Sequence, residues 1–213
     1  MDFNTFLESV VNIKHLPLLG EEAHVKLSPP YRLQLAEKYK ERRKTAPEAG
    51  VMALFYPDNS NMTKLVLILR KTYKGVHSAQ VGFPGGKVEG FDIDLKHTAL
   101  RETEEEIGVS MEQITVIKPL SPLYIPPSNF MVHPFLGVSE SELYFKMQED
   151  EVEDIIEVPI ADILNDNNII QTKVPTSYKV DVEVPAFILN EKIVWGATAM
   201  MLSEIKVLLK QVL

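Results

Sequence analysis

Residues 83–109, FPGGKVEGFDIDLKHTALRETEEEIGV, constrain the fold more than any other segment. The run Pro84-Gly85-Gly86 cannot continue a helix or a central strand, so it predicts a loop whose backbone can approach another group closely. Asp92 or Asp94 can then cap a helix, which we expect over residues 94–107. Its apolar face is formed by residues at helical spacing: Leu95, Ala99, Leu100, Thr103 and Ile107. The segment therefore predicts a loop followed by an amphipathic helix.

Three carboxylates lie along one edge of that apolar face. Glu102, Glu105 and Glu106 fall within an arc of about 100°, because positions i, i+3 and i+4 are helical neighbours. Adjacent carboxylates repel each other by roughly 0.2–0.5 kcal/mol per pair. A hard cation such as Mg²⁺ or Mn²⁺, which prefers oxygen ligands, would offset this repulsion. The alternative is a solvated acidic helix face that binds nothing.

The order of residues from Gly86 to Val109 resembles the Nudix box of diphosphate hydrolases. The Arg-Glu-x-x-Glu-Glu-x-Gly core of that box is complete over residues 101–108. The first acid is Asp92, where the general box has Glu, and it lies one residue further from Arg101 than in the general box. This spacing is similar to that of the coenzyme A diphosphatase (pyrophosphatase) branch of the family.

Further segments resemble the same branch, so that the resemblance covers about residues 46–213. Residues 150–164 resemble its acidic loop leading into a helix, and residues 194–202 resemble its C-terminal strand-to-helix junction; residues 77–86 and 121–135 match as well. The upstream signature of the branch is kept at Arg70 and at residues 83–86. It differs at four positions: Ile68, Lys71, Gly75 and Ala79.

The resemblance implies a set of site residues. The metal ligands would be the carboxylates of Glu102, Glu105 and Glu106 and the backbone carbonyl of Gly86. The catalytic residues would be Arg101, Glu105, Glu106 and Glu151. Arg101 is expected to orient a carboxylate through an ion pair, and either Glu105 or Glu151 to accept a proton from water. The substrate would be bound by Arg70, Lys74 and Gly85, with a basic residue between Arg70 and Lys74 contacting the 3'-phosphate of coenzyme A.

The remainder of the chain mixes strand and helix patterns without regular alternation. Short apolar runs predict strands at 51–56 and 65–69, joined as a hairpin, and further strands within 113–117, 131–138 and 177–189. Helical spacing predicts helices over 2–14, from 28 to about 44, and over 197–213. We therefore expect an α/β (α+β) fold with a mixed sheet, implied by the resemblance to be an α/β/α sandwich. Residues 1–45 would form an N-terminal helical extension and residues 46–213 the Nudix hydrolase domain.

Composition excludes several classes of protein. The net charge of −8 argues against binding to a nucleic-acid backbone, and the absence of Cys excludes disulfides and thiolate metal sites. The first 15 residues lack the basic and apolar regions of a secretory signal. No run approaches the roughly 18 apolar residues of a membrane span. We therefore expect a cytoplasmic protein without a membrane or nucleic-acid partner.

The resemblance implies metal-dependent hydrolysis of a nucleoside diphosphate linkage, with Mg²⁺ or Mn²⁺ as cofactor. Coenzyme A, cleaved to 3',5'-ADP and 4'-phosphopantetheine, is the first candidate substrate. ADP-ribose or another nucleoside diphosphate sugar is the alternative substrate. A Nudix-like module that binds a nucleotide without cleaving it is the alternative from another class of protein. The partner would be a small nucleotide substrate. Formation of a homodimer is a further possibility that the sequence leaves undecided.

Overall fold

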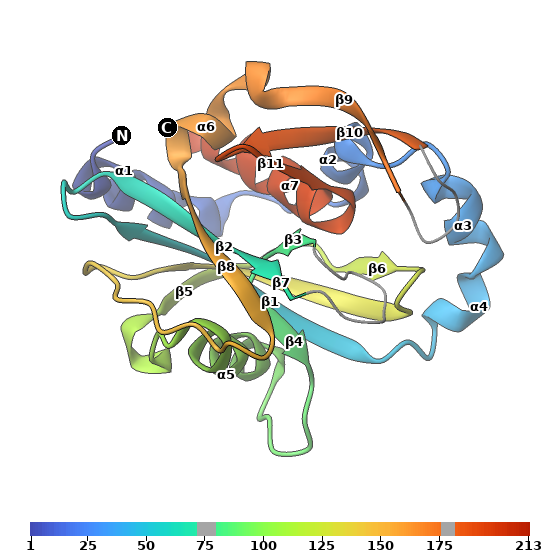
Figure 1. Ribbon diagram of the computed structural model, residues 1–213, viewed down its shortest axis with the longest axis horizontal. Helices are drawn as coiled ribbons and strands as arrows, with labels where there is room; N and C mark the ends of the chain where they lie inside the picture. Colours follow the sequence, from blue (N-terminus) through green and yellow to red (C-terminus); the bar gives the residue numbers. More distant parts are fainter. Residues whose placement is uncertain (72–79, 176–181) are drawn as a thin grey trace.

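The computed structural model describes residues 1–71, 80–175 and 182–213. A mixed β-sheet lies between helix α5 (Leu95–Ile107) on one face and helix α7 (Gly196–Val212) on the other (Figure 1). This arrangement confirms the mixed α/β fold and its α/β/α layers. Across the described ranges, no helix is both long and apolar enough to cross a membrane.

Two sheets form from the strands in the described ranges. The larger sheet has the order β3-β2-β1-β7-β5, with β4 and β8 pairing β1 and β2 and with β6 pairing β7. Only β1 and β7 pair in parallel there, among the described strands. Its strands are β1 (Glu48–Pro57), β2 (Thr63–Arg70), β3 (Val81–Gly82), β4 (Gly85–Lys87), β5 (Thr115–Pro119), β6 (Leu123–Ile125), β7 (Phe130–Val138) and β8 (Val152–Pro159). The smaller antiparallel sheet contains β9 (Ile169–Val174), β10 (Val182–Leu189) and β11 (Lys192–Trp195).

Strand β1 shows why the sheet is buried on both faces. Met52, Leu54 and Tyr56 pack in the cluster that contains the apolar side of α5. The alternate residues Ala53 and Phe55 pack in the cluster that contains α7. Because side chains alternate along a strand, a continuous apolar run is the pattern of a strand covered on both sides. The predicted hairpin is confirmed, since β1 pairs antiparallel with β2.

The N-terminal segment packs against the same core as α7. Helix α1 (Phe3–Val10) begins after Asp2, whose carboxylate accepts hydrogen bonds from the backbone N–H groups of Asn4 and Thr5. Its side chains Phe3, Phe6 and Val10 are fully buried in the cluster formed with α7. It is followed by a 3₁₀ turn (Val11–His15), α2 (Glu21–His24), a second 3₁₀ turn (Val25–Leu27), α3 (Arg32–Lys38) and α4 (Lys40–Arg43). The domain boundary between residues 45 and 46 stays a prediction.

Four details differ from the sequence-based expectations. The helix expected from residue 28 to about 44 is two short helices with a break at Tyr39, whose backbone leaves the helical region. The strand expected at 113–117 begins later, at Thr115, because a Ser110 capping box starts a 3₁₀ turn (Met111–Gln113) first. Residues 177–181 of the expected strand region lie outside the described residues, and β10 occupies the remainder of that region from Val182.

The other two differences concern burial. The acidic loop at residue 150 was expected to lead directly into a helix, but β8 intervenes before α6 (Ile160–Leu164), because Val152, Ile156 and Val158 are buried where β8 pairs with β2. Helix α7 was expected to have one apolar side. Instead it lies between the two sheets and the N-terminal helices, so that even Glu204 and Lys206 are buried.

Candidate active site

The loop expected at Pro84-Gly85-Gly86 is partly wrong, because Gly85 and Gly86 belong to the short strand β4 and pair with β1 in the part that β2 leaves free. This strand also contacts α5. Gly85 has a φ of 148°, and a Cβ atom there would lie 2.4 Å from the carbonyl oxygen of Gly50. A Cβ atom at Gly86 would lie 2.4 Å from Oε2 of Glu102. Only glycine fits at Gly85, and the Glu102 carboxylate lies directly against the backbone of β4 at Gly86.

Asp92 fixes the connection between β4 and α5. Its fully buried carboxylate accepts two hydrogen bonds from Arg101, from Nε at 2.9 Å and from Nη2 at 3.0 Å. It also accepts from the Glu89 backbone and from Oγ1 of Thr98. The Arg101 hydrogen bonds hold the pKa of Asp92 well below its usual range, against the effect of burial. The helix cap itself is Asp94, which accepts from the His97 backbone N–H at 2.7 Å.

Arg101 joins this buried anchor to two carboxylates of the helix. Its Nη1 atom lies 2.9 Å from Oε1 of Glu102 and 2.8 Å from Oε2 of Glu105. Arg101 is buried, whereas the Glu105 side chain is 56% exposed. The ion pair expected for Arg101 is therefore present, and it orients both carboxylates.

Glu106 is turned into the protein and is only 2% exposed. Its Oε2 accepts from the Gly85 backbone N–H at 2.8 Å, and its Oε1 lies 3.1 Å from Nη1 of Arg70. Burial raises the pKa of Glu106 to about 7, although Arg70 and the Gly85 N–H oppose the shift. The burial of Glu106 excludes a solvated acidic face as the explanation of this residue.

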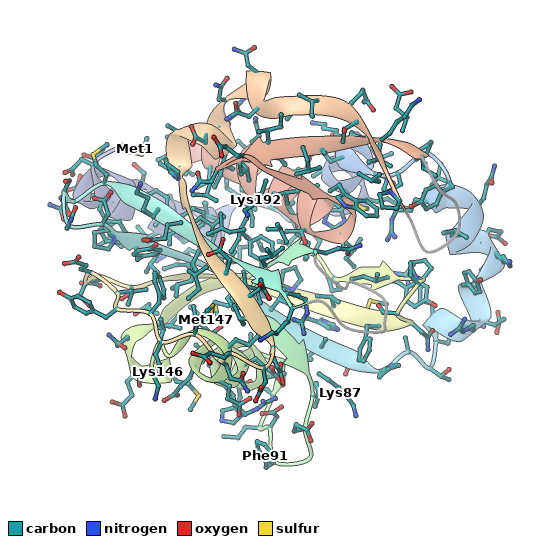
Figure 2. The ribbon with its side chains drawn as sticks, viewed as in Figure 1. Met1, Lys87, Phe91, Lys146, Met147 and Lys192 are labelled. Carbon is teal, nitrogen blue, oxygen red and sulfur yellow. The ribbon has the colours of Figure 1, made fainter. Side chains whose placement is uncertain are left out.

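The segment after β7 brings a further acid to the site. The backbone N–H groups of Lys146 and Gln148 donate to the carbonyls of Ile107 and Glu106, at 2.9 and 3.0 Å, so this segment runs beside the end of α5, as Figure 2 shows at the labels of Lys146 and Met147. Glu151 follows in an exposed turn. Its negative charge contributes to raising the pKa values of both Glu102 and Glu106, after the larger effect of burial.

A cavity of about 590 Å³ opens beside these residues. Arg70, Gly85 and Gly86 line it where it adjoins the carboxylates. The remaining lining is mostly apolar and comes from residues 29–35, 49–51, 80–83, 125–132 and 195–201, together with Lys87. Its size is within the usual range of small-molecule sites.

Most residues expected at the site therefore lie in one region. Glu102, Glu106, Arg70, Gly85 and Gly86 are joined by the short distances given above. Glu105 and Arg101 adjoin them at the surface, and Glu151 lies close enough to affect their charge. Lys74 lies outside the described residues, as do Gly75 and Ala79.

Two features were missed by the sequence analysis. The buried anchoring role of Asp92 was not recognised, although its distance of nine residues from Arg101 was a usable signal. The contribution of residues 29–35 to the cavity was also missed. Nothing local in that segment indicates a contact with residues almost a hundred positions away.

Within the ranges that the structure describes, no three His, Asp or Glu side chains are grouped closely enough to hold a metal ion as they stand. The oxygen donors are nevertheless the type that Mg²⁺ and Mn²⁺ prefer. Burial and neighbouring negative charges raise the pKa values of Glu102 and Glu106, so their ionised forms lack full compensation here. A divalent cation would supply that compensation, and the residues present therefore fit one.

The family profile described as NUDIX domain matches residues 45–177, more than half of the chain. The chain belongs to the Nudix family. The match contains the whole of β4, α5 and the Glu151 turn, and thus every residue of the carboxylate site described above. It does not contain residues 29–35 or 195–201, which line the cavity.

Similar proteins include the "Mitochondrial coenzyme A diphosphatase NUDT8" of Homo sapiens, 33% identical over 59% of this chain and 53% of that protein. An "Uncharacterized Nudix hydrolase NudL" of Yersinia enterocolitica is 37% identical over 47% of this chain and 51% of that protein. These alignments span about half the length of the curated relatives. A solved MutT/nudix family protein from Enterococcus faecalis is 20% identical with a TM-score of 0.48, over 84% of this chain and 69% of that chain.

Proposed function

We propose that this protein hydrolyses the diphosphate linkage of coenzyme A, yielding 3',5'-ADP and 4'-phosphopantetheine. The observation that carries the proposal is the pair of under-compensated carboxylates, Glu102 and Glu106, held against the backbone of β4 at the edge of a 590 Å³ cavity. The similarity to a human coenzyme A diphosphatase supports the choice of substrate.

Glu102, Glu105, Glu106 and the Gly86 carbonyl would hold Mg²⁺ or Mn²⁺. When bound, such a cation neutralises charge on diphosphate oxygens and on the leaving phosphate. Among the described residues, the arginines beside these acids are already engaged, because Arg101 is held by Asp92 and Arg70 is held by Glu106.

The residues of the chain divide into positioning and proton-transfer roles. Arg101 is a positioning residue: its bidentate contact with Asp92 fixes the guanidinium, which in turn fixes Glu102 and Glu105. Glu106 is buried and already bonded to Gly85 and Arg70, so it is poorly placed to accept a proton from an attacking water. Glu105 and Glu151 are exposed and remain the two candidates for the general base.

The reaction consumes one water for each bond cleaved. The water oxygen attacks one phosphorus atom, the bond from that phosphorus to the bridging oxygen breaks, and the bridging oxygen stays with the other phosphate. One proton of the water passes to Glu105 or Glu151. Two phosphate monoesters leave, and the carboxylate returns its proton to solvent.

The test is an assay with Mg²⁺ or Mn²⁺ on coenzyme A, its thioesters, ADP-ribose and NADH, with products identified by mass spectrometry. We expect coenzyme A to give 3',5'-ADP and 4'-phosphopantetheine, and EDTA to abolish the reaction. Preferred cleavage of ADP-ribose to AMP and ribose 5-phosphate would overturn the choice of substrate. Binding of nucleotides without cleavage of any would overturn hydrolysis, and turnover that survives thorough chelation would overturn the metal requirement.

A further inference from the structure

One wall of the cavity is formed by an N-terminal segment that lies before the matched Nudix domain. Pro29, Tyr31, Arg32 and Leu35 line the cavity, whereas the family match begins at residue 45. Nη2 of Arg32 on helix α3 donates to the backbone carbonyl of Tyr124 in β6 at 2.7 Å. The segment is thereby attached to β6, whose Ile125 also lines the cavity.

Arg32 brings an incompletely compensated positive charge to this wall. Burial lowers the pKa of its guanidinium, and the charge of Glu21 only partly opposes that effect. Within the described residues, no carboxylate lies at ion-pair distance from Arg32, and its hydrogen bond to Tyr124 uses one of five N–H donors. A partly buried cation of this kind is costly unless an anion meets it.

The other basic side chains of the lining are differently placed. Arg70 forms an ion pair with Glu106 and belongs to the carboxylate site. Lys87 is exposed to solvent and lies on β4, as Figure 2 shows. Among the described lining residues, Arg32 is therefore the half-buried cation with free donors. Planar donor pairs of this type bind phosphate oxygens bidentately.

We propose that Arg32 binds a phosphomonoester on the nucleotide half of the substrate, at a distance from the diphosphate that is cleaved. This inference rests on the proposed function and adds a residue that selects between substrates. In coenzyme A the group is the 3'-phosphate, since the pantetheine half carries no further anion. The nucleotide half would then occupy the cavity, where Phe130 and Trp195 supply aromatic surface for the base. This assignment is an alternative to the expectation that a basic residue between Arg70 and Lys74 binds this phosphate, which stays a prediction.

The test compares binding of 3',5'-ADP and 5'-AMP by calorimetry, which requires no cleavage. For the wild type we expect tighter binding of 3',5'-ADP. Arg32→Ala should weaken the binding of 3',5'-ADP by about 10- to 100-fold, because one or two charge-assisted hydrogen bonds are lost. The affinity for 5'-AMP should change by less than about 2-fold. The affinity of Arg32→Lys for 3',5'-ADP should lie between those of the wild type and Arg32→Ala. The matched control is Arg42→Ala on α4, an exposed arginine that does not line the cavity.

If Arg32→Ala weakens the binding of both nucleotides equally, or of neither, the proposed role of Arg32 is overturned. If Arg32→Ala fails to fold, Arg32→Gln decides the question, because it retains a donor for the Tyr124 carbonyl and removes the charge. In turnover, kcat/KM should fall on coenzyme A but not on dephospho-coenzyme A, through KM rather than kcat. Absence of coenzyme A cleavage by the wild type would refute the proposed function alone, because the two binding experiments would still judge Arg32.

Discussion

Two buried glutamates lie on helices at opposite faces of the sheet, and their surroundings differ sharply. Glu106 on α5 is 2% exposed and Glu204 on α7 is 0% exposed. Burial raises the pKa of Glu106 to about 7, despite Arg70 and the Gly85 N–H. Burial also tends to raise the pKa of Glu204, but the neighbouring His24 side chain and hydrogen bonds from Ser121 and Gly20 prevail and lower it to about 2.

The difference follows from the number of donors. Oε1 of Glu204 accepts from the backbone N–H groups of Leu19 and Gly20, both at 3.1 Å, and from Oγ of Ser121 at 2.6 Å. Its Oε2 accepts from the Ser121 backbone at 3.0 Å and lies 3.5 Å from Nε2 of His24. Glu204 therefore fastens the N-terminal segment to the core through a satisfied carboxylate. Glu106 lacks such compensation, which is the condition expected of a group that acts on a ligand.

Glu106→Gln should separate catalysis from stability. We expect turnover to fall about 10³-fold, equivalent to about 4 kcal/mol of transition-state stabilisation. Stability without metal should change by only a few tenths of a kcal/mol, because the raised pKa of Glu106 shows that the neutral form is tolerated. Steady-state kinetics and thermal melting measure the two effects. Glu104→Gln, on the exposed side of the same helix, is the control and should be nearly silent; equal turnover in both variants would contradict the assignment.

Glu204→Gln should give the reverse result, with a loss of stability and little change in turnover. The amide group would place N–H donors against the N–H groups that now donate to the carboxylate, so we expect a loss of about 3 kcal/mol in the free energy of unfolding. Denaturant titration measures this loss. Below the melting transition, kcat and KM should stay within about 2-fold of wild type, since Glu204 does not line the cavity. A large loss of kcat in the folded variant would show that the two regions are coupled.

The pH dependence of stability should reveal the lowered pKa of Glu204 when wild type is compared with Glu204→Gln. Because the folded pKa of Glu204 is lowered to about 2, its contribution to stability is present above the unfolded value near 4.5 and is lost as pH falls through this window. Between pH 5 and pH 3 this loss is about 2 kcal/mol. His24 is the titratable group that faces Glu204, and it is retained in Glu204→Gln. Wild type should therefore lose about 2 kcal/mol more than this variant; parallel curves would contradict the lowered pKa.

Arg101→Lys tests the positioning of the carboxylates with the smallest expected effect. An ammonium group cannot contact both oxygens of Asp92 and also reach Glu102 and Glu105, whereas the guanidinium does so. We expect a loss of about 10-fold in kcat, or ~1.4 kcal/mol, with KM little changed. Addition of Mg²⁺ at higher concentration should restore part of the rate if misplaced ligands are the cause. Unchanged kcat at all metal concentrations would refute a positioning role.

The sequence by itself determined the parts of this protein that depend on near neighbours along the chain. The spacing of Arg101, Glu102 and Glu106, the hairpin of β1 and β2, and the helix capped by Asp94 all follow from short-range periodicity and capping. The family match over residues 45–177 contains this local pattern.

Tertiary structure decided the contacts between distant segments. Arg32 meets the Tyr124 carbonyl across 92 positions, and Glu204 meets Leu19 across 185. The acidic residues of β8 hid its strand pattern in the sequence, and the strand forms because β2 provides a partner for it. Local periodicity carries no information on which distant segment will pair. Burial and the donors that distant segments supply made Glu106 and Glu204 different from the exposed glutamates that they resemble in sequence.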